Sequence, residues 1–157
     1  LSEIESTAPD SEIYWSVENN TLGEAALVVI SEMGEENIAG TFITESRKAG
    51  SSRSYRRGFT TTNKSKLAAC SKFKNWIESD KMEIASNTLL RETKTFIARG
   101  ASYSAKEGET DDLVMAALLV VRVAQQVAQY DETTYNELKD SFSDEEDLAP
   151  MPFVFLA

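Results

Sequence analysis

The 157-residue sequence contains no histidine and a single cysteine, Cys70. A disulfide framework within the chain is therefore excluded, and so sparse a use of cysteine is typical of a reducing compartment. A structural zinc site and a histidine-based catalytic triad are also excluded, because both need residue types that are missing here. Acid–base or metal chemistry in this chain must use carboxylates, lysine or tyrosine.

Long hydrophobic runs are missing as well. The longest run, residues 113–121, ends at Arg122 and is too short to cross a hydrocarbon layer about 30 Å thick, so we expect no membrane partner. Hydrophobic residues make up 41% of the chain and charged residues 27%. This is the ordinary balance of a globular protein, and the length fits one domain.

Three long stretches of the chain carry charge of almost only one sign. Residues 1–45 hold ten acids and no base, residues 46–77 hold nine bases and no acid, and residues 131–147 hold eight acids and one lysine. The net charge of −10 hides these blocks. The basic block could neutralise the phosphates of a nucleic acid. The alternative, to which we give equal weight on charge alone, is a solvated loop that pairs with the protein's own acidic surface.

The first half of the chain predicts a strand, a helix and a second strand. Residues 12–18 (EIYWSVE) alternate and are rich in β-branched and aromatic side chains, which favours a strand. Residues 19–21 predict a turn and helix cap, residues 23–33 a helix that stops at Gly34, and residues 38–43 a strand parallel to the first. Residues 47–58 predict a loop.

The second half predicts mostly helices. Asn63 is expected to cap a helix over residues 64–79, with Cys70 buried on its apolar stripe. Further along the chain we expect a short strand at 82–85, a helix from Asn87 that includes Phe96 and Ile97, and a hairpin or edge strand at 98–106. A helix with a buried first half is expected at 113–129. An acidic helix or loop should follow at 131–147, and a terminal strand or docking tail at 149–157.

Two acidic features stand out within this pattern. Glu18 ends the first strand, and ligands gather at the carboxyl ends of strands in α/β sheets. Its alternative interpretation is a glutamate that faces water. Asp111 and Asp112 begin the most apolar helix, where one aspartate is an ordinary cap, but two adjacent carboxylates repel each other. A divalent cation would relieve that repulsion, since Mg²⁺ binds through one or two carboxylates, waters and phosphate oxygens.

These motifs resemble the nuclease domain of the large terminases of tailed bacteriophages, most closely those of myovirus type. The sequence VENNTLG at 17–23 resembles the second acidic motif of that domain, and DDLVMA at 111–116 resembles the third. The segment TNKSK at 62–66, with its helix and the following Asp80 and Lys81, is similar to the intervening family segment. The tail at 147–155 also matches, so the likeness covers residues 13–155.

The resemblance implies a ribonuclease H-like mixed sheet flanked by helices, and an endonuclease that cuts double-stranded DNA during packaging. It implies Mg²⁺ or Mn²⁺ held by Glu18 and by Asp111 or Asp112, of which we expect Asp112 to be the ligand and Asp111 its support. Other terminase subunits and the portal would be partners, in the cytoplasm of an infected bacterium. The residues expected to contact DNA phosphates are Arg53, Arg56, Arg57, Lys64 and Lys66.

Two departures from the family pattern bear on activity. The family's first aspartate lies on a strand upstream of the glutamate motif, whereas Asp10 here lies in an Ala-Pro-Asp-Ser turn. We therefore expect residues 1–157 to be a partial nuclease domain without the first catalytic strand or the ATPase domain, with an open sheet edge that could drive dimerisation. Thr110 stands where relatives often have histidine. The alternative function is a non-catalytic module that binds DNA or protein through its basic loop and acidic C-terminal segment.

Overall fold

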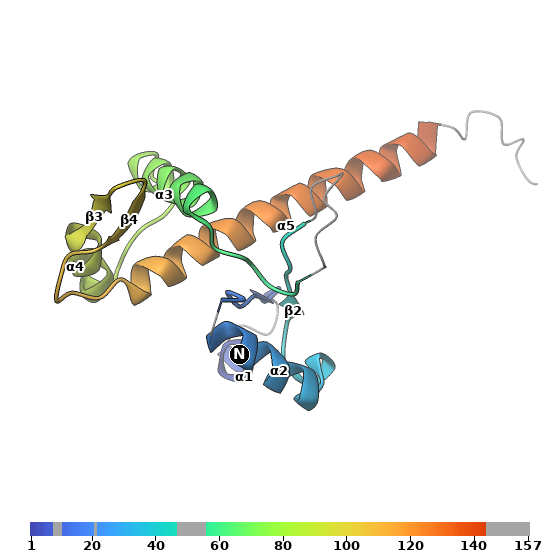
Figure 1. The fold of residues 1–157 in the computed structure, drawn as a ribbon. Helices are drawn as coiled ribbons and strands as arrows, with labels where there is room; N and C mark the ends of the chain where they lie inside the picture. Colours follow the sequence, from blue (N-terminus) through green and yellow to red (C-terminus); the bar gives the residue numbers. More distant parts are fainter. Residues whose placement is uncertain (8–10, 21, 47–55, 144–157) are drawn as a thin grey trace, which may run out of the picture. The chain divides into compact units, whose positions relative to one another are not determined.

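A computed structural model describes residues 1–7, 11–20, 22–46 and 56–143. Several predictions fall outside these residues, namely those for Thr21, Arg53, most of the 47–58 loop and the 149–157 tail. Leu1–Gln126 and Val127–Ala157 form two compact units. Every contact described below lies in the first unit. Figure 1 follows the elements in chain order. They begin with α1 (Ser2–Thr7), β1 (Tyr14–Trp15), α2 (Leu22–Met33), η1 (Glu35–Asn37) and β2 (Thr41–Phe42).

The predicted strand–helix–strand unit is confirmed. In the chain, β1 comes before α2 and β2 comes after it. The two strands pair in parallel, with Tyr14 opposite Thr41 and Trp15 opposite Phe42. Both strands are shorter than predicted, because the regular pairing stops after two residues. The extended chain nevertheless continues to Glu18, which forms an isolated parallel bridge with Phe59. A third segment therefore pairs beyond the end of β1 and meets the glutamate.

The helix predicted at 64–79 is present as α3 (Asn63–Glu78), but its cap is Thr62 and not Asn63. The Thr62 hydroxyl accepts from the Ser65 amide at 3.1 Å, and the Ser65 hydroxyl accepts from the Thr62 amide at 2.9 Å. This reciprocal capping box satisfies two backbone donors at once, which a cap at Asn63 would not achieve.

The next helix is α4 (Asn87–Thr95), capped by Ser86, and it ends earlier than predicted. Phe96 lies in β3 (Phe96–Arg99), which pairs antiparallel with β4 (Ser102–Ala105), so the predicted hairpin is confirmed. The strand predicted at 82–85 is wrong, since those residues join no ladder. Their alternation has another cause, because Met82 and Ile84 pack against the hydrophobic core.

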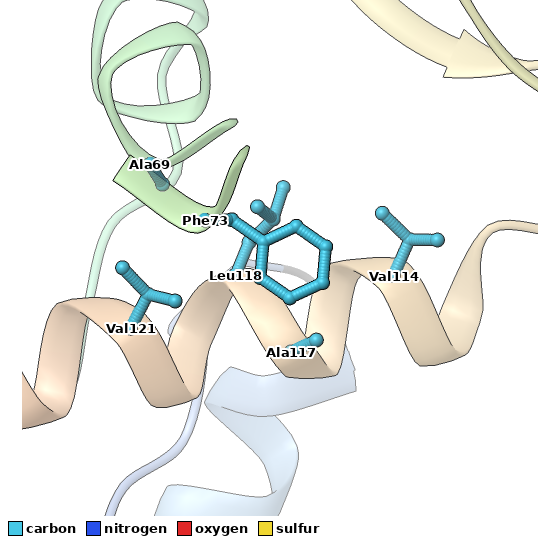
Figure 2. Packing of buried hydrophobic residues seen from close by; sticks show 6 residues of the cluster. All are labelled: Ala69, Phe73, Val114, Ala117, Leu118 and Val121. Atoms are coloured by element: carbon cyan, nitrogen blue, oxygen red, sulfur yellow. The ribbon is translucent and has the colours of Figure 1, made fainter. Parts of the chain in front are cut away.

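The last helix, α5 (Asp112–Ser143), is longer than the predicted 113–129 and takes in much of the acidic segment. Its first half is buried along one stripe only, since Leu113 and Val120 remain exposed. Figure 2 shows side chains of α3 pointing onto that stripe. The buried cluster consists of Ala69, Phe73, Val114, Ala117, Leu118 and Val121.

By length and composition, Asp112–Asp131 could also cross a membrane. The core helix of a soluble protein passes the same test. Here Val114 and Val121 lie in the α3–α5 core, and Arg122, in the middle of the segment, forms an ion pair with Glu45. These contacts favour the core-helix interpretation.

The described residues thus confirm the α/β class. They contain two separate two-stranded sheets, one parallel and one antiparallel. The α3–α5 core and the segment that pairs with Glu18 determine where the acidic motifs lie.

Candidate functional site

Glu18 is held by backbone pairing on both sides. The Phe59 amide donates to the Val17 carbonyl at 3.0 Å, and the Asn19 amide donates to the Phe59 carbonyl at 2.9 Å. The side chain is half-buried, and its Oε1 accepts from the Asn20 amide nitrogen Nδ2 at 3.0 Å. Glu18 is therefore oriented by its neighbours and does not simply point into water.

The other residues of the 17–23 motif have structural roles that fix this glutamate. Asn19 is only 2% exposed. Its Nδ2 donates to the Arg57 carbonyl at 2.8 Å, and its Oδ1 accepts from the Thr60 hydroxyl at 2.9 Å. Gly23 approaches the strand end so closely that a Cβ atom would stand 1.5 Å from the Glu18 carbonyl oxygen. Only glycine fits there, so the motif couples the start of α2 to the end of the strand.

The two aspartates differ in environment. The Asp111 carbonyl accepts from the Met115 amide at 2.8 Å, which makes Asp111 the residue that caps α5 through its backbone. Its side chain is 27% exposed. Asp112 is the first residue of α5 and is exposed. Of the pair, Asp111 is the one drawn into the molecule.

The N-terminus of α5 is capped by a residue that the sequence did not point to, the 7%-exposed Glu92 of α4. Its Oε2 accepts from the Leu113 amide at 2.8 Å and from the Val114 amide at 3.2 Å, and its Oε1 accepts from the Thr110 hydroxyl at 3.1 Å. A carboxylate is favourable at this end of a helix. Because Glu92 takes the capping position, the side chain of Asp111 is not needed for it.

Asp111 instead turns toward the hairpin and α3. Its Oδ2 accepts from the Ala105 amide at 3.2 Å and lies 4.0 Å from the Lys66 Nζ. The Lys66 side chain is 15% exposed, and its Nζ lies 5.3 Å from the centre of the Phe96 ring. The interpretation of Asp111 as a cap only, and of Lys66 as part of a solvated face, therefore fails for these two side chains.

Lys66 and Glu18 both line one small pocket. The pocket is partly open to solvent, and its volume of about 10 Å³ is close to the least that holds one water molecule. The remaining lining residues are Thr61, Ala69, Met115, Leu118, Leu119 and Arg122. Neither Asp111 nor Asp112 lines this pocket, and Lys66 is the residue that both lines it and pairs with Asp111. The predicted convergence of the two acidic motifs on one metal therefore stays a prediction.

Arg122 is the second functional candidate that sequence reasoning missed. Its Nη2 binds Glu45 Oε1 at 2.9 Å and the Thr60 carbonyl at 3.1 Å. Its guanidinium also lies 4.8 Å from the centre of the Phe59 ring. The sequence did contain an indication of this role, because an arginine that interrupts an apolar helix becomes buried only where other groups pair with it. Arg122 fastens α5 to the 59–60 segment that pairs with Glu18.

The predicted DNA-contacting residues do not form one set. Arg56 pairs with Glu24 at 3.6 Å across exposed side chains, and Arg57 pairs with Glu35. These two arginines therefore follow the self-pairing alternative. Lys64 is exposed on α3, and Lys66 faces the pocket. Arg53 lies outside the described residues.

Carboxylate oxygens are the ligands that Mg²⁺ and Mn²⁺ prefer. Glu18 and Asp111 would supply two such groups. Within the described residues, no group of three potential ligands gathers.

Cys70 lies one turn beyond Lys66 on α3, where it is half-buried and packs against the hydrophobic core. Burial raises the pKa of its thiol, and the nearby positive charge of Lys66 lowers that pKa in part. The thiol therefore favours its neutral form, and the charge of Lys66 partly offsets that preference.

A comparison with protein-family models found no match for this chain.

Proposed function

We propose that this chain is the metal-binding part of an endonuclease, resembling the nuclease domain of a phage large terminase with a ribonuclease H-like fold, that cuts double-stranded DNA with Mg²⁺ or Mn²⁺. The observation that carries the proposal is the position of Lys66. It lines the pocket of Glu18 and pairs with Asp111, so that both acidic motifs are linked through one side chain. The parallel β1–β2 unit is the second support, because it brings the glutamate to a strand end.

Asp111 is the primary ligand of the aspartate pair in this proposal, and Asp112 is secondary. Asp111 faces Lys66, whereas Asp112 is exposed at the first position of α5. Glu18 and Asp111 would hold the metal ion, and the ion would supply Lewis-acid chemistry that lowers the pKa of a bound water and offsets charge on the departing oxygen. The chain's own residues hold and orient the ligands. Asn20 fixes the Glu18 carboxylate, and the Ala105 amide fixes that of Asp111.

A non-catalytic module that binds DNA is the second candidate. It is favoured by the pocket itself, in which Lys66 and Arg122 outnumber the single acid Glu18. Two cations beside one carboxylate suit a phosphate group, and they would hold DNA without cutting it. Both candidates predict DNA binding, so cleavage must separate them.

The test is nicking of supercoiled plasmid with Mn²⁺ by this chain. The proposal expects nicking and its loss in Glu18→Gln. Glu83→Gln is the matched control, because Glu83 is exposed and is not part of the pocket lining. Intact plasmid, under conditions in which the chain binds DNA, would establish the non-catalytic module.

Calorimetric titration with MnCl₂ tests the ligand assignment separately from cleavage. Asp111→Asn is expected to weaken Mn²⁺ binding by about tenfold or more, as is usual when a carboxylate ligand is lost, while Asp112→Asn changes it less. The reverse order would return the primary role to Asp112. Absence of any Mn²⁺ uptake by the unaltered chain would remove the metal site altogether.

A further inference from the structure

The connection between α3 and α4 (Figure 1) contains an extended segment, residues 82–85. Met82 and Ile84 are half-buried and pack against the hydrophobic core, whereas Glu83 and Ala85 are exposed, which is the alternation of an extended chain. Within the part of the chain that the structure describes, no group hydrogen-bonds to the backbone N–H and C=O groups of these residues. Such free backbone groups are a template for pairing with a further strand.

A groove of about 380 Å³, open to solvent, lies along this segment. Its volume is within the range of about 300–1,000 Å³ that is usual for ligand clefts. The apolar part of its lining consists of Ile77 near the end of α3, Met82 and Ile84 of the segment, and Leu90 of α4. Ile77 is 37% exposed and Leu90 is 38% exposed. The groove therefore offers apolar surface to the side chain of a peptide whose backbone pairs with residues 82–85.

The charged residues of the groove lining are both acidic, namely Asp80 and Glu83. Asp80 has a left-handed φ of 54°, and its amide donates to the Ile77 carbonyl at 3.2 Å, which fixes its backbone just past the end of α3. Lys81 is exposed beside them but is not part of the lining. Two acids at an apolar groove favour an occupant that carries positive charge next to an apolar side chain.

The occupants that this chain could itself supply lack that charge pattern. A second copy docked groove to groove would bring Asp80 and Glu83 against the same two acids, and like charges placed opposite each other are unfavourable. The segment at 149–157 of this chain contains no lysine or arginine. An extended basic segment of another protein meets both the backbone and the charge requirement.

We propose that residues 82–85 and the groove beside them bind an extended segment of a partner protein, in which an apolar residue is flanked by lysine or arginine. The bound segment pairs with the free backbone groups, its apolar side chain enters the groove between Ile77 and Leu90, and its cations face Asp80 and Glu83. This site is separate from the acidic motifs and does not depend on the proposed nuclease function. It gives the strand-like alternation at 82–85 a neighbour from outside the chain.

The test is nuclear magnetic resonance of the ¹⁵N-labelled whole chain with synthetic peptides of the form acetyl-Gly-Lys-Val-X-Val-Lys-Gly-amide, where X is Leu, Ile, Phe or Tyr. In an extended peptide both lysines and X lie on one face. The inference expects at least one of these peptides to slow hydrogen exchange of alternate backbone amides within 82–85. It should bind about tenfold or more tightly than the matched peptide with Glu in place of both lysines.

The variant Asp80→Asn combined with Glu83→Gln removes both acids from the groove. Asparagine also adopts a positive φ readily, so the backbone at residue 80 is kept. The preference for the lysine peptide over the glutamate peptide should then fall to within about twofold. Glu109→Gln is the matched control, because Glu109 is exposed and does not line the groove, and it should leave the preference unchanged.

Several results would overturn the inference. These are no binding by any lysine peptide at millimolar concentration, equal binding of the lysine and glutamate peptides, or binding that leaves the exchange of the 82–85 amides unchanged. Slow exchange of these amides in the chain alone would also overturn it. If that protection rises with the concentration of the chain, a second copy occupies the groove, and if it does not, another part of the same chain does.

Discussion

Replacement of Glu92 by alanine is the most direct perturbation of the site's framework. Glu92 is 7% exposed, and its carboxylate accepts from the amides of Leu113 and Val114 and from the Thr110 hydroxyl. Glu92→Ala removes the cap of α5 immediately after Asp111. Asp111 and Asp112 then lose the contact that fixes the start of their helix.

The magnitude follows from these contacts. A hydrogen bond to a charged group contributes about 1.5–3 kcal/mol, and a buried donor without a partner costs about 1–3 kcal/mol. The Val114 amide is in a buried setting, whereas Leu113 is exposed and its amide can find water. We therefore expect Glu92→Ala to lower the free energy of unfolding by about 3 kcal/mol. For a chain of this size that corresponds to a fall in melting temperature of about 6–12 °C.

The assay is urea unfolding followed by circular dichroism, with Glu92→Gln and Glu83→Ala as comparisons. Glutamine keeps an acceptor oxygen and loses the charge, so its effect should be about 1 kcal/mol. Glu83 is an exposed glutamate outside any helix, and its removal should change stability by less than about 0.5 kcal/mol. If Glu92→Ala were as mild as Glu83→Ala at an unchanged m-value, the cap assigned to Glu92 would be refuted.

Three further predictions concern the packing around the site. Gly23→Ala should destabilise by about 4 kcal/mol or more or prevent folding in a denaturation assay, because its Cβ would meet the Glu18 carbonyl at 1.5 Å. Arg122→Ala should lower the free energy of unfolding by about 2 kcal/mol in the same assay, mainly through the lost carbonyl bond and ring contact, since its acidic partner is largely solvated. Cys70 should react slowly with a thiol reagent at neutral pH, and more slowly still in Lys66→Met, because burial raises the pKa of the thiol and the lysine charge lowers it. As the folded thiol resists ionisation, its contribution to stability should fall as the pH rises above the thiol's ordinary pKa.

The predictions that succeeded rest on local patterns. Alternation at residues 12–18 and helical spacing at 23–33 gave the strand and helix of the parallel unit, because both periodicities are properties of the chain itself. The hairpin was also predictable from Gly100, because glycine readily adopts the positive φ that a tight turn often needs. In the structure, φ of Gly100 is 57°. The strand predicted at 82–85 failed because alternation shows which side chains are buried and not whether a neighbouring strand exists.

The candidate site could be predicted only in part. The motifs predicted Glu18 and the aspartate pair as cation ligands from residue type and position alone. The environment that distinguishes Asp111 from Asp112 depends on Ala105 and Lys66, which lie in other elements. Glu92 gave no signal, because a glutamate in a polar helix is ordinary until that helix docks on another.

The sequence by itself determined the α/β class, the helix and strand periods and the acidic groups available for chemistry, since these depend on neighbours within a few residues. Only the tertiary structure decided which of those groups face one another. Packing of α3 on α5 turns Lys66 inward to Asp111, and pairing of Phe59 with Glu18 brings the glutamate to the same pocket. These contacts join segments far apart in the chain, and their energies depend on burial and distance, which no local pattern encodes.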